Sequence, residues 1–237
     1  MQWQCSSRTD AGKVRKINED SIYHNDEQQL WVVADGMGGH HRGDIASQTV
    51  VRYLETFAAT PHTGISLQRI DNLLASANAE LIEKAETEGA DIVASTCALM
   101  LRHKNTVVCV WVGDSRVYRY RRGALTQLTR DHSYQSLLED LRNAGEKVDD
   151  FMVNTQTLTR GIGAENHLQV EKCHFSVESG DRYLLCTDGL YKEVSDQELL
   201  DYYNTITDDE TLVATLHQAY LDGGARDNLG VILVTTN

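Results

Sequence analysis

The sequence predicts an α+β fold in which helices are layered on antiparallel sheet. Apolar runs of strand length recur along the chain, and several are separated only by short polar connectors. Such connectors favour antiparallel hairpins, because parallel neighbours need a crossover of about a dozen residues. Helical periodicity comes in blocks and does not follow every strand, so a regular βαβ alternation is not expected.

The first part of the chain contains an early strand and a pair of helices. The apolar run 30–34 has the composition of a buried strand. Apolar residues then recur at spacings of four, three and four from Ala46 to Phe57, and a second stripe runs from Ile70 to Ala85. These spacings place side chains on one face of a helix, so two amphipathic helices are expected.

A block of strands follows the helix pair. The apolar runs are 92–101, 106–112 and 116–120, with polar connectors at 103–105 and 121–123. The last part returns to a mixed pattern, with a strand at 183–187 and a final strand at 229–235.

Two helices are expected between these last strands. Ser195-Asp-Gln-Glu198 and Thr207-Asp-Asp-Glu210 both have the spacing of a capping box, which opens a helix. Gly223-Gly224 is typical of a helix end.

Composition excludes several classes of protein. The net charge of −13 has the wrong sign for a protein that binds a phosphate backbone, so nucleic acid is not an expected partner. The five cysteines form no CxxC pair. No apolar stretch is long enough to cross a membrane, and the first residues lack the pattern of a leader. We expect one domain over 1–237, monomeric and cytoplasmic, with no membrane partner.

Aspartates follow or precede the predicted strands. Asp35, Asp114 and Asp188 stand at strand ends, and Asp227 stands just before the last strand. Asp-Gly is also a common hairpin signal, so each aspartate alone has an ordinary interpretation as a turn residue. The runs after Asp35 and Asp188 do not return directly into a partner strand, however. We therefore expect these acids to meet at one edge of a sheet.

Such a cluster requires cations. Carboxylates within about 5 Å of one another repel and raise each other's pKa unless a cation compensates them. Mg²⁺ and Mn²⁺ prefer oxygen ligands, so the cluster indicates a hydrated Mg/Mn centre. Arg15 lies shortly before Glu19 and Asp20, and its guanidinium suits a phosphate held by two hydrogen bonds. Taken alone, this segment has the alternative interpretation of a solvated charged turn.

With these pieces in order, the sequence resembles the type 2C, metal-dependent serine/threonine protein phosphatases in their bacterial form. The resemblance covers nearly the whole chain. The matching motifs are Gly12…Arg15…Asn18-Glu19-Asp20, Val33-Ala-Asp35-Gly36-Met-Gly-Gly-His40, Ala94-Ser-Thr-Cys-Ala98, Val112-Gly-Asp114-Ser-Arg116, Leu128-Thr-Arg-Asp-His-Ser133, Leu158-Thr-Arg-Gly-Ile-Gly163, Leu185-Cys-Thr-Asp188-Gly-Leu190 and Ala225-Arg-Asp227-Asn228.

The resemblance implies a four-layer α-β-β-α sandwich, with two antiparallel sheets flanked by antiparallel helix pairs and two Mn²⁺ or Mg²⁺ ions at one end. The site residues that it implies are Asp35 (bridging both ions), Asp188 and Asp227 (completing one), Glu19 and the backbone carbonyl of Gly36 (binding the other), Asp20 (holding waters) and Arg15 (clamping the phosphate). Glu19 has the alternative of binding only through water.

The chemistry that the resemblance implies is direct hydrolysis of phosphoserine and phosphothreonine in proteins, without a phosphoenzyme intermediate. A water between two cations is acidic enough to attack phosphorus in line with the leaving group. The implied partners are a phosphorylated protein and a cognate serine/threonine kinase, and type VI secretion is one context that such bacterial members serve.

Three departures from the family pattern affect what carries over. Met37 stands where eukaryotic members have a histidine, and it donates no proton; His40 is a candidate donor, with a structural role as the alternative. Lys192 replaces an acid that helps to hold a third ion, so a third ion at Asp114 is expected to be weak or absent. The segment 133–159, where the family has a flap, contains an unusual helical pattern over 134–145.

Two other functions stay open at this point. A catalytically weak regulatory or binding module would have the same fold, but such modules usually lack a metal aspartate, and Asp35, Asp188 and Asp227 are all present. A His/Asp metallohydrolase would use the pairs 40–41 and 131–132. Adjacent histidines in an extended chain point to opposite sides, which makes them a poor chelate.

Overall fold

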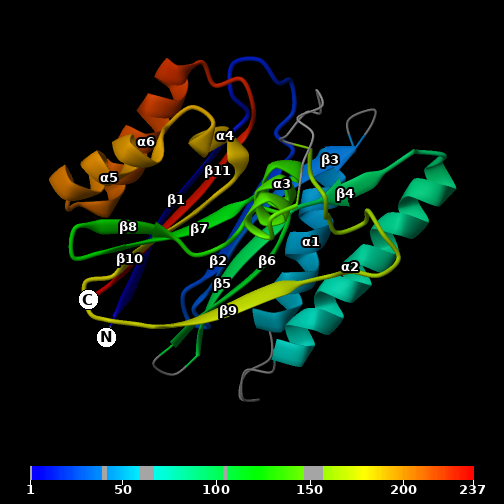
Figure 1. Cartoon of the computed structure of the whole chain (residues 1–237), viewed down its shortest axis with the longest axis horizontal. Coiled ribbons are helices and arrows are strands. Elements are labelled where there is room, and N and C mark those ends of the chain that lie inside the picture. Colours follow the sequence, from blue (N-terminus) through cyan, green and yellow to red (C-terminus); the bar gives the residue numbers. More distant parts are fainter. Residues whose placement is uncertain (1, 39–41, 59–66, 104–105, 147–156) are drawn as a thin grey trace.

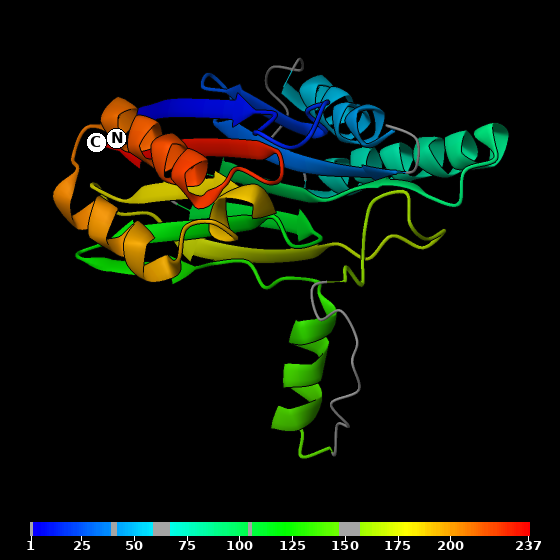
Figure 2. The same ribbon diagram turned by 90° about the horizontal axis from the view of Figure 1, so that it is seen from above.

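The computed structural model describes residues 2–38, 42–58, 67–103, 106–146 and 157–237. It contains two antiparallel sheets that face each other, with helices on both outer faces (Figures 1 and 2). The predicted α+β class and the four-layer arrangement are therefore confirmed.

The six-stranded sheet carries the first helix pair on its outer face (Figure 1). Its strands in spatial order are β2 (Asp20–Asn25), β3 (Leu30–Gly38), β5 (Cys97–His103), β6 (Thr106–Val112) and β9 (Glu171–Ser176), and β4 (Val93–Ser95) also pairs with β3. The helices are α1 (Gly43–Ala58) and α2 (Leu67–Glu88).

The five-stranded sheet carries the C-terminal helices (Figure 2). Its strands in spatial order are β1 (Trp3–Asp10), β11 (Leu229–Thr236), β10 (Arg182–Cys186), β7 (Arg116–Arg121) and β8 (Ala124–Gln127). The helices are α4 (Asp188–Tyr191), α5 (Asp196–Thr205) and α6 (Asp209–Gly223).

The apolar core forms three layers, one between the sheets and one under each helix group. Strand β3 shows why its sequence is apolar without interruption. Leu30 and Val32 pack in the layer under α1 and α2, whereas Trp31 and Val33 pack between the two sheets. Because successive side chains of a strand point to opposite faces, a strand buried on both faces needs apolar residues at every position.

Strand boundaries differ from the prediction in two places. The run 92–101 is divided at Thr96 into β4 and β5, and β3 continues past Asp35 to Gly38. Strands β1, β8 and β9 were not predicted, because each lies at an end of its sheet and consists of half-buried and exposed positions without a continuous buried run.

The helix caps agree with the sequence at one position and differ at another. Ser195 and Glu198 form the predicted capping box at the start of α5. The prediction that Thr207 caps α6 was wrong, because the cap is Asp208, whose carboxylate accepts hydrogen bonds from the backbone nitrogen and hydroxyl of Thr211 at 2.8 and 2.6 Å. An ionised carboxylate is the stronger acceptor at a helix N-terminus. Gly224 ends α6 with a φ of 126°.

One helix stands apart from the layers. Helix α3 (Tyr134–Asn143) projects from the body of the molecule (Figure 2), and it covers most of the helical pattern predicted at 134–145. Its base is held where Ser133 pairs with Leu158. Within the described part of the chain, none of the helices has the length and apolar character needed to cross a membrane.

Candidate metal and phosphate site

Carboxylates from both sheets meet in one cleft of about 300 Å³ at one end of the sandwich. The residues that line it are Arg15, Glu19, Asp35, Gly36, Met37, Gly38, Thr96, Asp114, Leu158, Asp188, Asp227 and Asn228. Seven of the eight site residues expected from the sequence are in this list. The eighth, Asp20, is paired with Asp35 on the neighbouring strand. The expected location at the edge of one sheet was wrong, because Asp35 belongs to the six-stranded sheet and Asp188 follows a strand of the other.

Asp35 and Asp20 are direct neighbours across strands β3 and β2. Burial, followed by the charges of Asp20 and Asp188, raises the pKa of Asp35 well above its ordinary value. Burial also raises the pKa of Asp20 to about 8, although its carboxylate accepts a hydrogen bond of 2.6 Å from the Thr187 hydroxyl. Asp20 is buried and Asp35 is half-buried where it lines the cleft, so these two adjacent carboxylates need positive charge nearby in order to ionise together.

Asp114 is a buried acid that lines the cleft from the turn that follows β6. Burial and the charge of Asp188 raise the pKa of Asp114 to about 7. The Tyr191 hydroxyl donates a hydrogen bond to the backbone carbonyl of Asp114 at 3.1 Å. This contact ties the turn to α4, which begins at Asp188.

Two basic side chains neutralise part of this charge. Lys192 forms an ion pair with Asp188 one helical turn away. Arg15 contacts both oxygens of Asp227, at 2.9 and 3.1 Å, and is half exposed at the mouth of the cleft. The ammonium and the guanidinium therefore form ion pairs with two carboxylates, Asp188 and Asp227, that were expected to bind metal ions.

The donor set fits hard divalent cations, because it consists of carboxylate and carbonyl oxygens. Among the described residues, the acids of the cleft form no group of three whose ligand atoms all lie within 4.8 Å of one another. A looser set of this kind suits ions that keep some of their waters, as Mg²⁺ does.

Asn228 holds the Glu19 segment in place. Its amide oxygen accepts a hydrogen bond from the backbone nitrogen of Glu19 at 2.8 Å, and its amide nitrogen donates to the carbonyls of Ala11 and Ile17 at 2.9 and 3.0 Å. The Glu19 carboxylate accepts from the backbone nitrogen of Gly43, the first residue of α1, at 3.1 Å. Asn228 belongs to the motif that ends Asp227-Asn228, for which the sequence predicted a role only at Asp227.

Gly36 is required by a close approach of two backbones. A Cβ atom at this position would lie 1.7 Å from the carbonyl oxygen of Gly43, so no side chain fits. The glycine thus lets α1 start directly against β3. Gly36 is buried and lines the cleft, where the resemblance implied a carbonyl ligand.

Thr96 explains the break between β4 and β5. Its hydroxyl accepts a hydrogen bond from the backbone nitrogen of Asp35 at 2.9 Å, and its own nitrogen donates to the Asp35 carbonyl at 2.8 Å. The Thr96 and Ser115 hydroxyls are 2.7 Å apart. Sequence reasoning missed this role, for which the only signal was a polar pair inside an apolar run.

The His/Asp alternative is not supported by the described residues. Both oxygens of Asp131 accept hydrogen bonds from Arg116, and that guanidinium lies 3.6 Å from the centre of the Tyr191 ring. His132 accepts a hydrogen bond from the Gly113 nitrogen at 3.0 Å. The Asp131 carboxylate and the His132 ring are therefore already hydrogen-bonded within the fold. His40 and His41 lie outside the described residues, as does part of the segment 133–159.

The amino-acid sequence is similar to those of known proteins. Residues 11–223 match the family described as protein phosphatase 2C. The serine/threonine phosphatase stp of Listeria innocua is 32% identical, with 97% of this chain and 94% of that protein covered. PstP of Mycobacterium tuberculosis is also 32% identical, over 96% of this chain and 44% of that protein.

Solved structures agree with these relatives. PppA, described as a key regulatory component of T6SS in Pseudomonas aeruginosa, is 33% identical with a TM-score of 0.90, covering 100% of this chain and 99% of that chain. The catalytic domain of the serine threonine protein phosphatase PstP, in complex with 2 manganese ions, is 30% identical with a TM-score of 0.85, covering 98% and 97%.

Proposed function

The chain belongs to the protein phosphatase 2C family of serine/threonine protein phosphatases, and we propose that it hydrolyses phosphoserine and phosphothreonine in the cleft that contains Asp35. The observation that carries this proposal is the meeting of Asp35, Asp188 and Asp227 from two sheets beside the guanidinium of Arg15. A phosphate group and its counter-cations are the chemistry that such a site accommodates.

Two Mn²⁺ or Mg²⁺ ions are the proposed cofactors. Asp35 would contact both, Asp188 and Asp227 would hold one, Glu19 and the Gly36 carbonyl would hold the other, and Asp20 would hold waters around them. When bound, such ions supply hydroxide near neutral pH and offset the negative charge of the phosphoryl oxygens. A manganese-bound relative supports the choice of metal.

The chain's own groups orient the substrate. Arg15 is half exposed at the mouth of the cleft, where its guanidinium can turn from Asp227 towards a phosphate. Met37 lines the cleft and donates no proton, so the leaving alkoxide takes its proton from water or from another side chain, with His40 as a candidate. No covalent phosphoenzyme is proposed.

A third cation at Asp114 is proposed to be weak or absent, because Lys192 already places an ammonium group at Asp188. The segment 133–159 is proposed to act as the flap of a single domain over 1–237. Leu158 from this segment lines the cleft, which supports a role in substrate choice.

The proposed partners are a phosphorylated protein and the serine/threonine kinase that phosphorylates it. The similarity to PppA supports a bacterial regulatory context such as type VI secretion. We expect the protein to act as a cytoplasmic monomer, without nucleic acid or membrane.

The test compares hydrolysis of para-nitrophenyl phosphate and a phosphothreonine peptide with and without Mn²⁺. Activity should require Mn²⁺ and disappear in Asp188→Asn, whereas Asp201→Asn, a change of an exposed acid on α5, should leave it unchanged. Inactivity of the folded wild-type protein with Mn²⁺ bound would instead favour the regulatory or binding module.

A further inference from the structure

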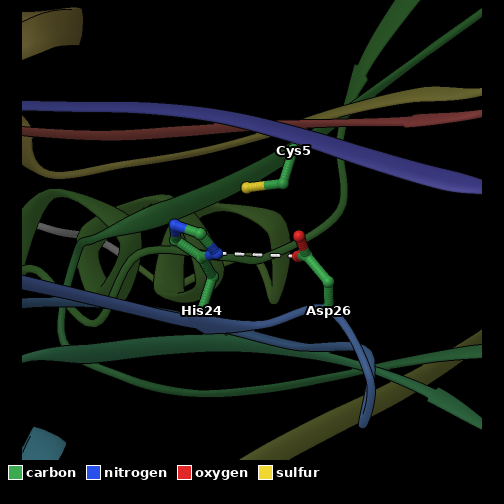
Figure 3. Close-up of side chains that lie close together, drawn as sticks. All are labelled: Cys5, His24 and Asp26. Atoms are coloured by element: carbon green, nitrogen blue, oxygen red, sulfur yellow. Dashed lines mark ion pairs between the residues drawn. The ribbon is translucent and has the colours of Figure 1, made fainter.

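Three side chains with different metal-binding atoms lie together outside the cleft. They are Cys5, His24 and Asp26 (Figure 3), and one ligand atom from each lies within 4.8 Å of the other two. His24 is four residues from Asp20 along the same edge of the sheet, which is about 13 Å in an extended strand. The group is therefore separate from the acids of the cleft.

The fold brings these residues together from the edges of both sheets. Strand β1 is the outermost strand of the five-stranded sheet, and β2 is the outermost strand of the other. Cys5 packs against the core between the sheets, as Ile22 does from β2. His24 is two residues beyond Ile22, so alternation places it on the same inward face of β2. Asp26 follows at the turn after the strand.

We propose that Cys5, His24 and Asp26 form a second metal site that binds a borderline divalent cation of the Zn²⁺ type. A thiolate, an imidazole and a carboxylate are the ligands that zinc accepts, and three protein ligands leave a fourth position for water. The all-oxygen cleft prefers Mg²⁺ or Mn²⁺, so ligand type separates the two sites.

The spacing of the three groups leaves room for such an ion. The ring nitrogen Nδ1 of His24 is 3.5 Å from Oδ1 of Asp26, at the outer limit of a hydrogen bond (Figure 3). Burial and the nearby Asp26 charge raise the pKa of Cys5 to about 12, so the thiol keeps its proton in the absence of a cation. Binding breaks the S–H bond, forms a sulfur–metal bond and releases the proton to solvent, with no change of oxidation state.

Such an ion would join the two sheets at their open edges. Strand β1 pairs only with β11, and β2 pairs only with β3, among the described residues. A ligand that binds only the folded protein stabilises it. The site therefore predicts that Zn²⁺ raises the unfolding temperature independently of catalysis.

The first test uses Co²⁺ as a spectroscopic probe of the full chain, with excess Mg²⁺ present to occupy the cleft. One equivalent of Co²⁺ should produce the intense near-ultraviolet band of sulfur-to-cobalt charge transfer, which oxygen ligands do not give. Cys5→Ser should abolish the band, and Cys173→Ser, at another half-buried thiol, should retain it. Absence of the band in the wild type, or its persistence in Cys5→Ser, would overturn the proposal.

The second test uses Zn²⁺. It should displace Co²⁺ and raise the unfolding temperature of the wild type. Loss of a group that hydrogen-bonds to a metal ligand lowers metal affinity by roughly 10–100-fold, so loss of the ligand itself in His24→Gln should lower Zn²⁺ affinity by at least as much. His174→Gln, at an exposed histidine on β9, should bind Zn²⁺ like the wild type.

Asp188→Asn should keep the cobalt band of the first test, so a failure of the proposed phosphatase activity does not affect this result. Equal Zn²⁺ affinity in His24→Gln and wild type would contradict the proposed ligand set.

Discussion

Replacing Lys192 by methionine should strengthen Mn²⁺ binding. The Lys192 ammonium is paired with Asp188, and a cation that uses this carboxylate must displace it. Methionine has a similar length and no charge, so the variant removes the competing group while leaving the carboxylate in place. Asp188 would then lie in the cleft without its partner, the residue that follows α4.

The magnitude follows from the burial of the pair. The side chains of Lys192 and Asp188 are 34% and 11% exposed, respectively. Exposed ion pairs contribute roughly 0–1 kcal/mol, and burial increases both the attraction and the desolvation cost. For a pair of intermediate exposure, after allowance for solvent screening, we take about 1–2 kcal/mol. Since 1.4 kcal/mol is a factor of ten, the Mn²⁺ dissociation constant should fall by roughly 5–30-fold.

The assay is titration of the metal-free protein with Mn²⁺, followed by calorimetry or by the electron paramagnetic resonance signal of the free ion. The matched control is Lys84→Met, because Lys84 forms an ion pair of the same spacing with Glu88 on α2, where no cleft acid is involved. Lys84→Met should bind Mn²⁺ like the wild type. Unchanged or weaker Mn²⁺ binding by Lys192→Met would refute the reasoning that the ammonium competes with a cation.

Three further predictions concern the scaffold. Asn228→Ala removes three hydrogen bonds from a buried amide, so urea unfolding should show a loss of about 1–3 kcal/mol, and an unchanged midpoint would contradict this role. Gly36→Ala places a Cβ 1.7 Å from a Gly43 backbone oxygen, so the unfolding temperature and Mn²⁺ affinity should both fall; retention of both would show that the approach relaxes freely. Burial opposes ionisation of Asp181, but hydrogen bonds from Arg121 and other donors outweigh it and lower its pKa below the ordinary 3.8. A depressed folded pKa stabilises the fold above the unfolded value and ceases to do so as pH falls through the folded value. The stability difference between wild type and Asp181→Asn, measured by urea unfolding, should therefore shrink below about pH 4, and a constant difference would contradict the assignment.

Much of the fold was predictable because its signals are local. The apolar run 30–34 and the stripe from Ile70 to Ala85 became β3 and α2, since burial imposes a period on nearby residues. The edge strand β9 was not predicted, because it alternates half-buried and exposed side chains and lacks a continuous apolar run. The cap of α6 was misplaced by one residue, since Thr207 and Asp208 are both good N-cap residues.

Part of the candidate site was likewise predictable from the sequence, and part was not. The acids were recognisable from their positions beside strands and from the order of the motifs, which are properties of the chain alone. The contacts of Asn228 with Ala11 and Ile17 join residues more than two hundred positions apart. The contact with Ala11 continues the pairing of β1 with β11, and the contact with Ile17 reaches the segment before β2 of the other sheet. Both depend on long-range strand pairing and sheet stacking, which no local pattern encodes.

The sequence by itself determined which side chains carry the chemistry: Asp35, Asp188 and Asp227 with Arg15, in an order that identifies the family. Only the tertiary structure decided that Asp35 comes from one sheet while Asp188 and Asp227 flank strands of the other, and that Cys5 and the segment 24–26 meet at the sheet edges. The physical reason is that residue type and strand period are local properties. Which strand ends become neighbours is set by sheet pairing and by the packing of the core between the sheets.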